Sequence, residues 1–186
     1  MVPIVLIATA LLLGAGPAAG ATVTARVTRV LSGDTILVEQ TLAPELGVVV
    51  YQGVAGAEVD YQPGDIPPPA RDTVCLDGVA APLLAQPFGP EARNALQAMV
   101  LNRSVTLEFE ERNPAGQIVG DLTVDGRWVN RELVAAGWAW CQTNYAFDAE
   151  LAAAQDQART NRLGLWRQDR PVPPWAWTPA AATNAP

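Results

Sequence analysis

Hydrophobic and polar residues alternate soon after the start of the chain. The alternation in residues 23–28 predicts a strand with one buried face. A tight turn is expected at residues 32–34, because Ser, Gly and Asp are typical turn residues. Residues 35–38 resume the extended pattern, so this region predicts two consecutive strands.

Three later segments have the same extended character. Residues 74–76 are a short apolar run that ends before a glycine, and residues 104–109 and 118–124 alternate. A turn is expected at residues 113–116, and Asp125-Gly126 is a hairpin signal. The sequence therefore predicts five main strands.

Three segments have helical periodicity. Residues 90–101 have a proline suited to the first turn and an apolar stripe. Residues 130–136 form a shorter amphipathic segment that Gly137 would terminate. Residues 148–162 carry leucine and alanine on one face. We expect about three helices.

Proline and glycine interrupt the rest of the chain. Residues 41–72 are expected to be an irregular insertion with one β-like run at 48–51. Residues 171–174 are rich in proline and are not expected to form a helix or a central strand. Residues 178–186 are small and are expected to be a disordered tail.

The order of these elements predicts the fold class. Three strands, a helix, two strands and two helices are typical of an α+β protein built on a small five-stranded OB-type barrel. No internal repeat is visible in the 186 residues, and the length fits one domain with appendages.

The N-terminus has the pattern of a secretory signal. Residues 1–21 carry no charged side chain, residues 2–13 are an apolar run, and Ala19-Gly20-Ala21 fits a signal peptidase site. No basic residue precedes the run, so a retained anchor is the alternative to cleavage after Ala21. In both cases we expect an exported protein, periplasmic or extracellular.

Composition excludes several kinds of chemistry. The formal net charge is −7, all twelve basic residues are arginine, and histidine is absent. An acidic chain is a poor candidate for tracking a phosphate backbone, so nucleic acid is an unlikely partner and an unknown protein is a possible one. Without histidine and with two cysteines, the common zinc sites cannot form.

Six segments, taken in order, resemble staphylococcal nuclease-like (thermonuclease) domains. They are VLSGDT (30–35), VCLDGVAAP (74–82), QPFGPEA (86–92), VNRELVAAGWA (129–139), RLGLW (162–166) and PPWAW (173–177). Each motif is weak alone, but six in the correct order are specific. The resemblance implies that residues 22–177 form a barrel domain of this family.

The resemblance also implies a site, because enzymes of this family cleave phosphodiesters with one Ca²⁺ held by oxygen ligands. The family's first-turn aspartate is present as Asp34. Its two arginines correspond to Cys75 and Gln117, its second metal-binding aspartate and the following threonine to Ala80 and Ala81, and its glutamate to Leu83. Of five charged roles one remains, so no calcium or other cofactor is expected.

Two other arrangements of the acidic groups are possible. If residues 52–58 are aligned with the third-strand motif instead, Glu58 takes the position of the glutamate, but the arginine and the aspartate are still missing. Alternatively, Glu58, Asp60 or Asp65 could fold back beside Asp34. Carboxylates in a loop rich in proline and glycine are more often solvated, and Asp34 itself is expected to bond its own turn.

The two cysteines have two possible states. An even number in an exported protein favours one disulfide. The resemblance implies that Cys75 and Cys141 lie close together, so we expect this bond, and two buried free thiols are the alternative. Cys75 is not expected to be a nucleophile, because no histidine is available to activate it.

The aromatic residues allow a further interpretation, since bases can stack on exposed rings in OB-type grooves. The six tryptophans mostly fall where the family packs its core or tail, so core packing is expected, with Trp175 and Trp177 docked on the body. Tyr145 corresponds to a tyrosine near the family's substrate pocket, but the position of that tyrosine's usual companion is occupied here by Thr143.

The sequence therefore favours a nuclease-like module that binds or assembles without catalysis. Any partner contact is most easily placed in the 41–72 insertion, because loops on rigid scaffolds commonly carry function. A Ca²⁺-dependent phosphodiesterase or endonuclease with a rearranged site is the alternative, and a single-strand nucleic-acid binder is a third hypothesis.

Overall fold

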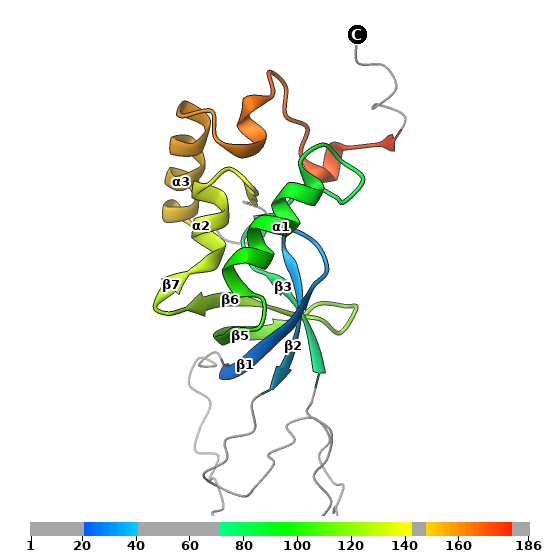
Figure 1. Ribbon diagram of the computed structural model, residues 1–186, viewed down its shortest axis with the longest axis vertical. Coiled ribbons are helices and arrows are strands. Elements are labelled where there is room, and N and C mark those ends of the chain that lie inside the picture. The colour runs from blue at the N-terminus through cyan, green and yellow to red at the C-terminus, as the bar shows by residue number, and fades with distance from the viewer. Residues whose placement is uncertain (1–20, 41–70, 143–147, 180–186) are drawn as a thin grey trace, which may run out of the picture.

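A computed structural model describes residues 21–40, 71–142 and 148–179. Its main sheet contains the strands β1 (Ala21–Val30), β2 (Thr35–Gln40), β3 (Arg71–Leu76), β5 (Ser104–Arg112) and β6 (Ile118–Val124). They follow the order β3-β2-β1-β5-β6, and a parallel pairing between β3 and β6 closes them into a barrel (Figure 1). The expected five-stranded OB-type α+β fold is confirmed.

Tertiary pairing extends the strands beyond their sequence signal. β3 begins at Arg71 rather than Val74, because Arg71 and Asp72 pair with Glu39 and Val38 of β2. The antiparallel pairing of β5 with β6 likewise continues to Arg112. Polar residues at a strand end give no alternating apolar signal, so the sequence predicts these strands too short.

Three two-residue strands have no sequence signature of their own. They are β4 (Val79–Ala80), β7 (Arg127–Trp128) and β8 (Trp140–Cys141). β7 extends the main sheet beside β6, and β4 pairs antiparallel with β8 in a separate two-stranded sheet. This small sheet connects the segment after β3 to the segment after the second helix.

The helices are α1 (Gly89–Val100), α2 (Val129–Ala135) and α3 (Ala149–Thr160), close to their expected ranges. The Asp148 carboxylate caps α3 by accepting hydrogen bonds from the Glu150 and Leu151 backbone amides. Two 3₁₀ turns follow, η1 (Gly164–Arg167) and η2 (Pro174–Ala176). The expectation that Pro174 lies outside any helix is wrong, because proline is tolerated in the first turn of a helix.

The core has two parts. The larger part fills the barrel and the inner faces of the three helices, and its fully buried residues include Ile36, Leu96, Leu107, Leu122 and Leu133. The smaller part, beneath the C-terminal segment, contains Trp140, Ala158, Leu165 and Trp166, with Phe88 packed against it. The smaller cluster holds the C-terminal segment against the end of α3.

A close approach of two glycines fixes the C-terminal segment. Gly137 and Gly164 have positive φ angles of 74° and 50°. A Cβ atom on Gly164 would lie 2.1 Å from the Gly137 carbonyl oxygen, and that oxygen accepts a hydrogen bond from Leu165 N at 2.8 Å. Only glycine permits this contact, so it anchors η1 to the end of α2.

The tryptophans do not share one environment. Trp140 and Trp166 are buried as expected, and Trp128, Trp138 and Trp177 are half-buried. Trp175 docks as expected, with its ring edge against buried Trp140, but 59% of the residue stays exposed, so core packing does not extend to it. A tryptophan in a short terminal turn has too few neighbours to bury its whole surface.

Several expectations fall outside the described residues. They concern the N-terminal segment, the run at 48–51, the carboxylates of the insertion, Thr143 with Tyr145, and the tail from residue 180. Among the described residues, none of the helices has the length and apolar character needed to cross a bilayer.

Candidate functional site

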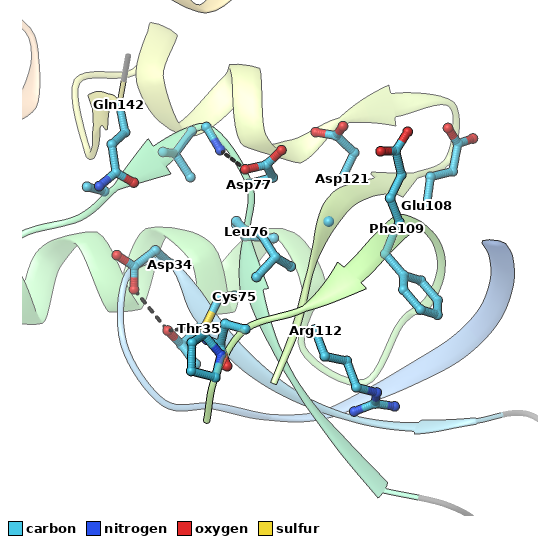
Figure 2. Close-up of a pocket in the computed structure, with 18 of the residues that line it drawn as sticks. Asp34, Thr35, Cys75, Leu76, Asp77, Glu108, Phe109, Arg112, Asp121 and Gln142 are labelled. Atoms are coloured by element: carbon cyan, nitrogen blue, oxygen red, sulfur yellow. Dashed lines mark hydrogen bonds between the residues drawn. The ribbon is translucent and has the colours of Figure 1, made fainter. Parts of the chain in front are cut away.

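An open cavity of about 1070 Å³ lies against the barrel wall, where β3, β5 and β6 meet the turn before β2 (Figure 2). Its lining is strongly acidic. Five carboxylates and one guanidinium contribute to it, from Asp34, Asp77, Glu108, Glu110, Asp121 and Arg112. Asp34, Cys75 and Ala80, three of the positions implied by the resemblance, are among the lining residues.

Asp34 is held by its own turn. Its Oδ1 accepts hydrogen bonds from Ser32 Oγ at 2.7 Å and from Thr35 Oγ1 at 3.0 Å. Its Oδ2 accepts one from the Ala81 backbone amide at 2.8 Å. The carboxylate therefore connects the first turn to the chain after β4, and both of its oxygens already have protein partners.

The tight packing around Gly33 explains why the turn takes this shape. Gly33 is buried, and a Cβ atom there would lie 2.5 Å from the Ala81 Cβ and 2.8 Å from the Ala92 Cβ. The first turn thus presses against α1 and the segment after β4 at once. This contact places Asp34 at the cavity edge.

Cys75 and Gln117, which occupy the two arginine positions implied by the resemblance, contact each other. β3 and β6 run parallel here, and the Cys75 thiol donates to Gln117 Oε1 at 3.3 Å. The same oxygen accepts a hydrogen bond from Asn113 Nδ2 at 2.9 Å. Burial raises the pKa of the Cys75 thiol and the Asp34 carboxylate raises it further, whereas the hydrogen bond with Thr35 lowers it.

The remaining predicted positions are apolar and lie in different places. Ala80, in β4, lines the cavity and is buried. Ala81 is also buried and contributes its backbone amide to Asp34. Leu83 is 48% exposed and lies outside the cavity lining. The structure thus brings Asp34, Cys75 and Ala80 to one wall, with Gln117 beside Cys75.

The guanidinium in the cavity is already paired. Arg112 Nη2 lies 2.8 Å from the Asp72 carboxylate, and Arg112 Nη1 donates to the Gly116 carbonyl at 2.8 Å. Figure 2 shows Arg112 below Asp77, Asp121 and Glu108 and apart from them. The cavity therefore holds an arginine without directing it at the carboxylates.

Sequence reasoning missed the acidic residues of this wall. Glu108 of β5 lies opposite Asp121 of β6 in the antiparallel register. Burial raises the pKa of Asp121, as do Asp77, Asp148 and Glu108, whereas the hydrogen bond from Trp128 Nε1 lowers it. The carboxylates at alternate positions 108 and 110 were the signal available in the sequence.

These carboxylates do not converge on one point. In the described part of the chain, no set of three or more His, Cys, Asp or Glu side chains is arranged to hold a metal ion. Asp77 instead accepts from the Gly78 backbone amide at 2.8 Å, and Asp121 accepts from Trp128 Nε1 at 2.7 Å. Each of these two carboxylates therefore has a hydrogen-bond donor of its own within the protein.

The expected disulfide is not formed, because Cys75 and Cys141 are both free. Cys75 lies in the barrel wall and its thiol bonds to Gln117. Cys141 lies in β8 of the separate sheet, opposite Val79, and it is 7% exposed. Burial raises the pKa of the Cys141 thiol, and Asp148 adds to the rise. The alternative of free thiols is therefore the correct one.

Fold and site together define the class of this protein as an OB-type barrel with a cavity beside the first turn, of the staphylococcal nuclease kind. The model of the family described as staphylococcal nuclease homologue matches residues 73–168. The chain belongs to this family.

Curated relatives support the assignment over the same region. A probable staphylococcal-like nuclease, CAN1, from Oryza sativa subsp. japonica is 39% identical over 102 residues, covering 55% of this chain and 31% of the relative. An uncharacterized endonuclease from Escherichia coli is 35% identical over 103 residues, covering 55% of this chain and 67% of the relative. The staphylococcal-like nuclease CAN1 of Arabidopsis thaliana is 33% identical over 102 residues. The chain spans about a third of the length of the plant relatives it matches.

Proposed function

We propose that this chain is an exported member of the family that binds or assembles through its nuclease-like domain and does not hydrolyse phosphodiesters. The observation that carries the proposal is the contact between Cys75 and Gln117 in the wall of an acidic cavity. Two neutral side chains that satisfy each other stand where the resemblance implies two cationic groups. A phosphate entering this cavity would meet carboxylates and no unpaired guanidinium among the described residues.

The proposed loss of metal binding has separate support. Asp34 uses both oxygens in hydrogen bonds to its own turn and to Ala81. The neighbouring family positions at Ala80 and Leu83 supply no side-chain oxygen ligand. A carboxylate engaged in this way stabilises the turn, which accounts for its presence without a bound ion.

The test compares the natural chain with a restored variant. The restored variant carries Cys75→Arg, Ala80→Asp, Leu83→Glu and Gln117→Arg together. Circular dichroism is used to check that this variant is folded. We expect the natural chain to release no nucleotides from single-stranded DNA with calcium and to bind no calcium by calorimetry. Calcium-dependent hydrolysis by the natural chain, abolished in Asp34→Ala, would refute the proposal. Hydrolysis gained by the restored variant alone supports it.

One observation favours the second candidate, a calcium-dependent nuclease with a rearranged site. Asp34, Asp77 and Asp121 all line one cavity, and the plant relatives are named nucleases. Such a site would depend on Asp77 as well as Asp34. Activity that is lost equally in Asp77→Asn and Asp34→Asn, with both variants folded by circular dichroism, would establish this candidate instead.

Export is the remaining part of the proposal. It rests on the uncharged residues 1–21 and the small residues before the expected cleavage after Ala21. Mass spectrometry of the protein from a bacterial periplasmic extract tests it. A mature chain that begins at Thr22 is expected, whereas an intact Met1 in the cytoplasmic fraction would contradict it.

A further inference from the structure

The exposed large hydrophobic residues of the described chain belong to the loop before α1, the segment before η1 and the segment around η2, which Figure 1 shows at one end of the molecule. They are Leu83, Leu84, Leu163, Val172 and Trp175, with exposed fractions between 37% and 59%. Single exposed hydrophobics scattered over a surface are ordinary, but a contiguous set is a feature of interaction sites. None of these five residues lines the acidic cavity.

A buried glutamine brings the two halves of this surface together. Gln86 is 4% exposed, and its Oε1 accepts a hydrogen bond from the Leu83 backbone amide at 3.2 Å. Its Nε2 donates to the Val172 carbonyl oxygen. The loop before α1 therefore lies against the segment before η2, as Figure 1 also shows. We refer to Leu83, Leu84, Val172 and Trp175 as the apolar patch.

A chain of ring contacts links the apolar patch to a group of arginines. The Trp175 ring meets Trp140 edge-on, with centroids 6.5 Å apart, and Trp140 meets Trp166 at 5.7 Å. The Arg159 guanidinium lies over the Trp166 ring, 4.3 Å from its centroid. These contacts pack the end of α3 and both 3₁₀ turns together through the buried rings of Trp140 and Trp166. Figure 1 shows the end of α3, η1, η2 and the loop before α1 at the same end of the molecule.

The charge of this surface is opposite to that of the whole chain. Residues 159–170 contain four arginines and one acidic residue, Asp169, in a chain of net charge −7. All four arginines are exposed: Arg159, Arg162, Arg167 and Arg170. Within residues 21–40, 71–142 and 148–179, none of the four forms an ion pair with a carboxylate.

We propose that this end of the molecule docks on the anionic surface of a phospholipid bilayer, with the apolar patch inserted and the arginines on the headgroups. Tryptophan and arginine are favoured at the interface between water and lipid, and aliphatic side chains gain by entering the acyl region. A single-stranded nucleic acid would use the arginines and the Trp175 ring but would leave Leu83, Leu84 and Val172 in water. The aliphatic half of the patch therefore favours lipid.

This docking is independent of the proposed loss of catalysis, although one residue connects the two. Leu83, which stands where the resemblance implies a catalytic glutamate, belongs to the apolar patch. A glutamate there would place a charge in the surface that enters the bilayer. None of the residues that line the acidic cavity belongs to the apolar patch.

The test uses the full chain and vesicles of defined composition. Every variant carries Leu11→Asp and Leu12→Asp, so that the apolar run of residues 2–13 does not itself insert. Sedimentation with vesicles of equimolar phosphatidylcholine and phosphatidylglycerol measures binding. Brominated phosphatidylcholine reports contact between tryptophan and the acyl region by quenching fluorescence. We expect binding that weakens with salt and is much weaker on phosphatidylcholine alone.

Matched variants separate this surface from general charge. Arg162→Gln with Arg170→Gln is expected to weaken binding about tenfold to thirtyfold, because each arginine contributes one favourable interaction with the anionic headgroups and two are lost. Arg26→Gln with Arg29→Gln removes the same charge from exposed residues of β1 and should leave binding unchanged. Trp175→Ala should remove the quenching by brominated lipid, and Leu84→Ser should weaken binding while the fold is kept.

Three results would overturn the proposal. The first is no sedimentation with the anionic vesicles at low salt. The second is an equal loss of binding in the β1 control and in the Arg162 and Arg170 variant. The third is binding to an oligothymidine that depends on Trp175 while the vesicles are not bound, which would assign the surface to nucleic acid. None of these outcomes depends on hydrolytic activity.

Discussion

The Cys75 thiol donates a hydrogen bond to Gln117 Oε1 across the parallel pair β3 and β6, over a separation of 42 residues and at 3.3 Å. These two positions correspond, by resemblance, to the family's two arginines. Two guanidiniums on one barrel wall need an anion between them, whereas a thiol and an amide satisfy each other. The pair is therefore stable without a bound phosphate.

Asp34→Ala is expected to destabilise the protein by about 1–3 kcal/mol, because three hydrogen bonds to a partly buried carboxylate are lost. Asp34→Asn should cost less, since its amide oxygen can still accept from Ala81 N. Urea unfolding measures both. Asp156→Ala, at an exposed position on α3, is the control. An Asp34→Ala variant as stable as the control would show that the carboxylate has no structural role.

Asn130→Ala should destabilise the protein by about 2 kcal/mol or more. The Asn130 side chain is fully buried, accepts from Leu122 N at 3.0 Å and donates to the Asp77 carbonyl at 2.9 Å. Its removal leaves buried backbone groups without partners at the junction of α2, β6 and the cavity. Asn94→Ala, on the exposed face of α1, should be nearly neutral in the same thermal unfolding experiment. Equal losses in the two variants would contradict this assignment.

Asp121→Asn should raise the thermal midpoint at neutral pH. Burial and the neighbouring carboxylates raise the pKa of Asp121, so the folded state holds this proton more tightly than the unfolded chain. The favourable contribution is therefore present at low pH and is lost as pH rises through the folded pKa. Asparagine keeps the acceptor for Trp128 and removes the charge at all pH values.

A pH series of melting curves tests this sign. The gain from Asp121→Asn should be present at neutral pH and should disappear in acid, where the natural carboxyl is protonated. Asp156→Asn removes one charge from α3 without touching the cavity and should show no such dependence. A gain that grows as pH falls would mean that the carboxylate is stabilised in its charged form.

Both cysteines should be detected as thiols after unfolding in air-oxidised protein. In the folded protein, alkylation by iodoacetamide should be slow at neutral pH and accelerate with increasing pH, because burial raises the pKa of both thiols. Cys141 is buried and Cys75 half-buried, so Cys75→Ser should remove the faster phase. Unfolded protein that yields no thiol would show that a disulfide forms after all.

Much of the fold followed from the sequence, because each main element has a local signature. The alternation in residues 118–124 gives the observed burial pattern of β6, and the apolar stripe after Pro90 gives α1. The two-residue strands and the extension of β3 to Arg71 did not follow, since they depend on partners elsewhere in the chain. Asp34, Cys75 and Ala80, which come from motifs far apart in the sequence, line one cavity.

The sequence by itself determined the barrel, its helices, its family and the identity of the residues at each implied catalytic position. Only the tertiary structure decided what those residues contact. The Cys75 thiol donates a hydrogen bond to Gln117 and is not bonded to Cys141. The Asp34 carboxylate accepts a hydrogen bond from the Ala81 amide, and Glu108 lies opposite Asp121. The physical reason is the distance along the chain over which each interaction acts. Periodicity and turn chemistry act over a few neighbouring residues, whereas hydrogen bonds between strands and the charge of a cavity depend on which distant segments the barrel brings together.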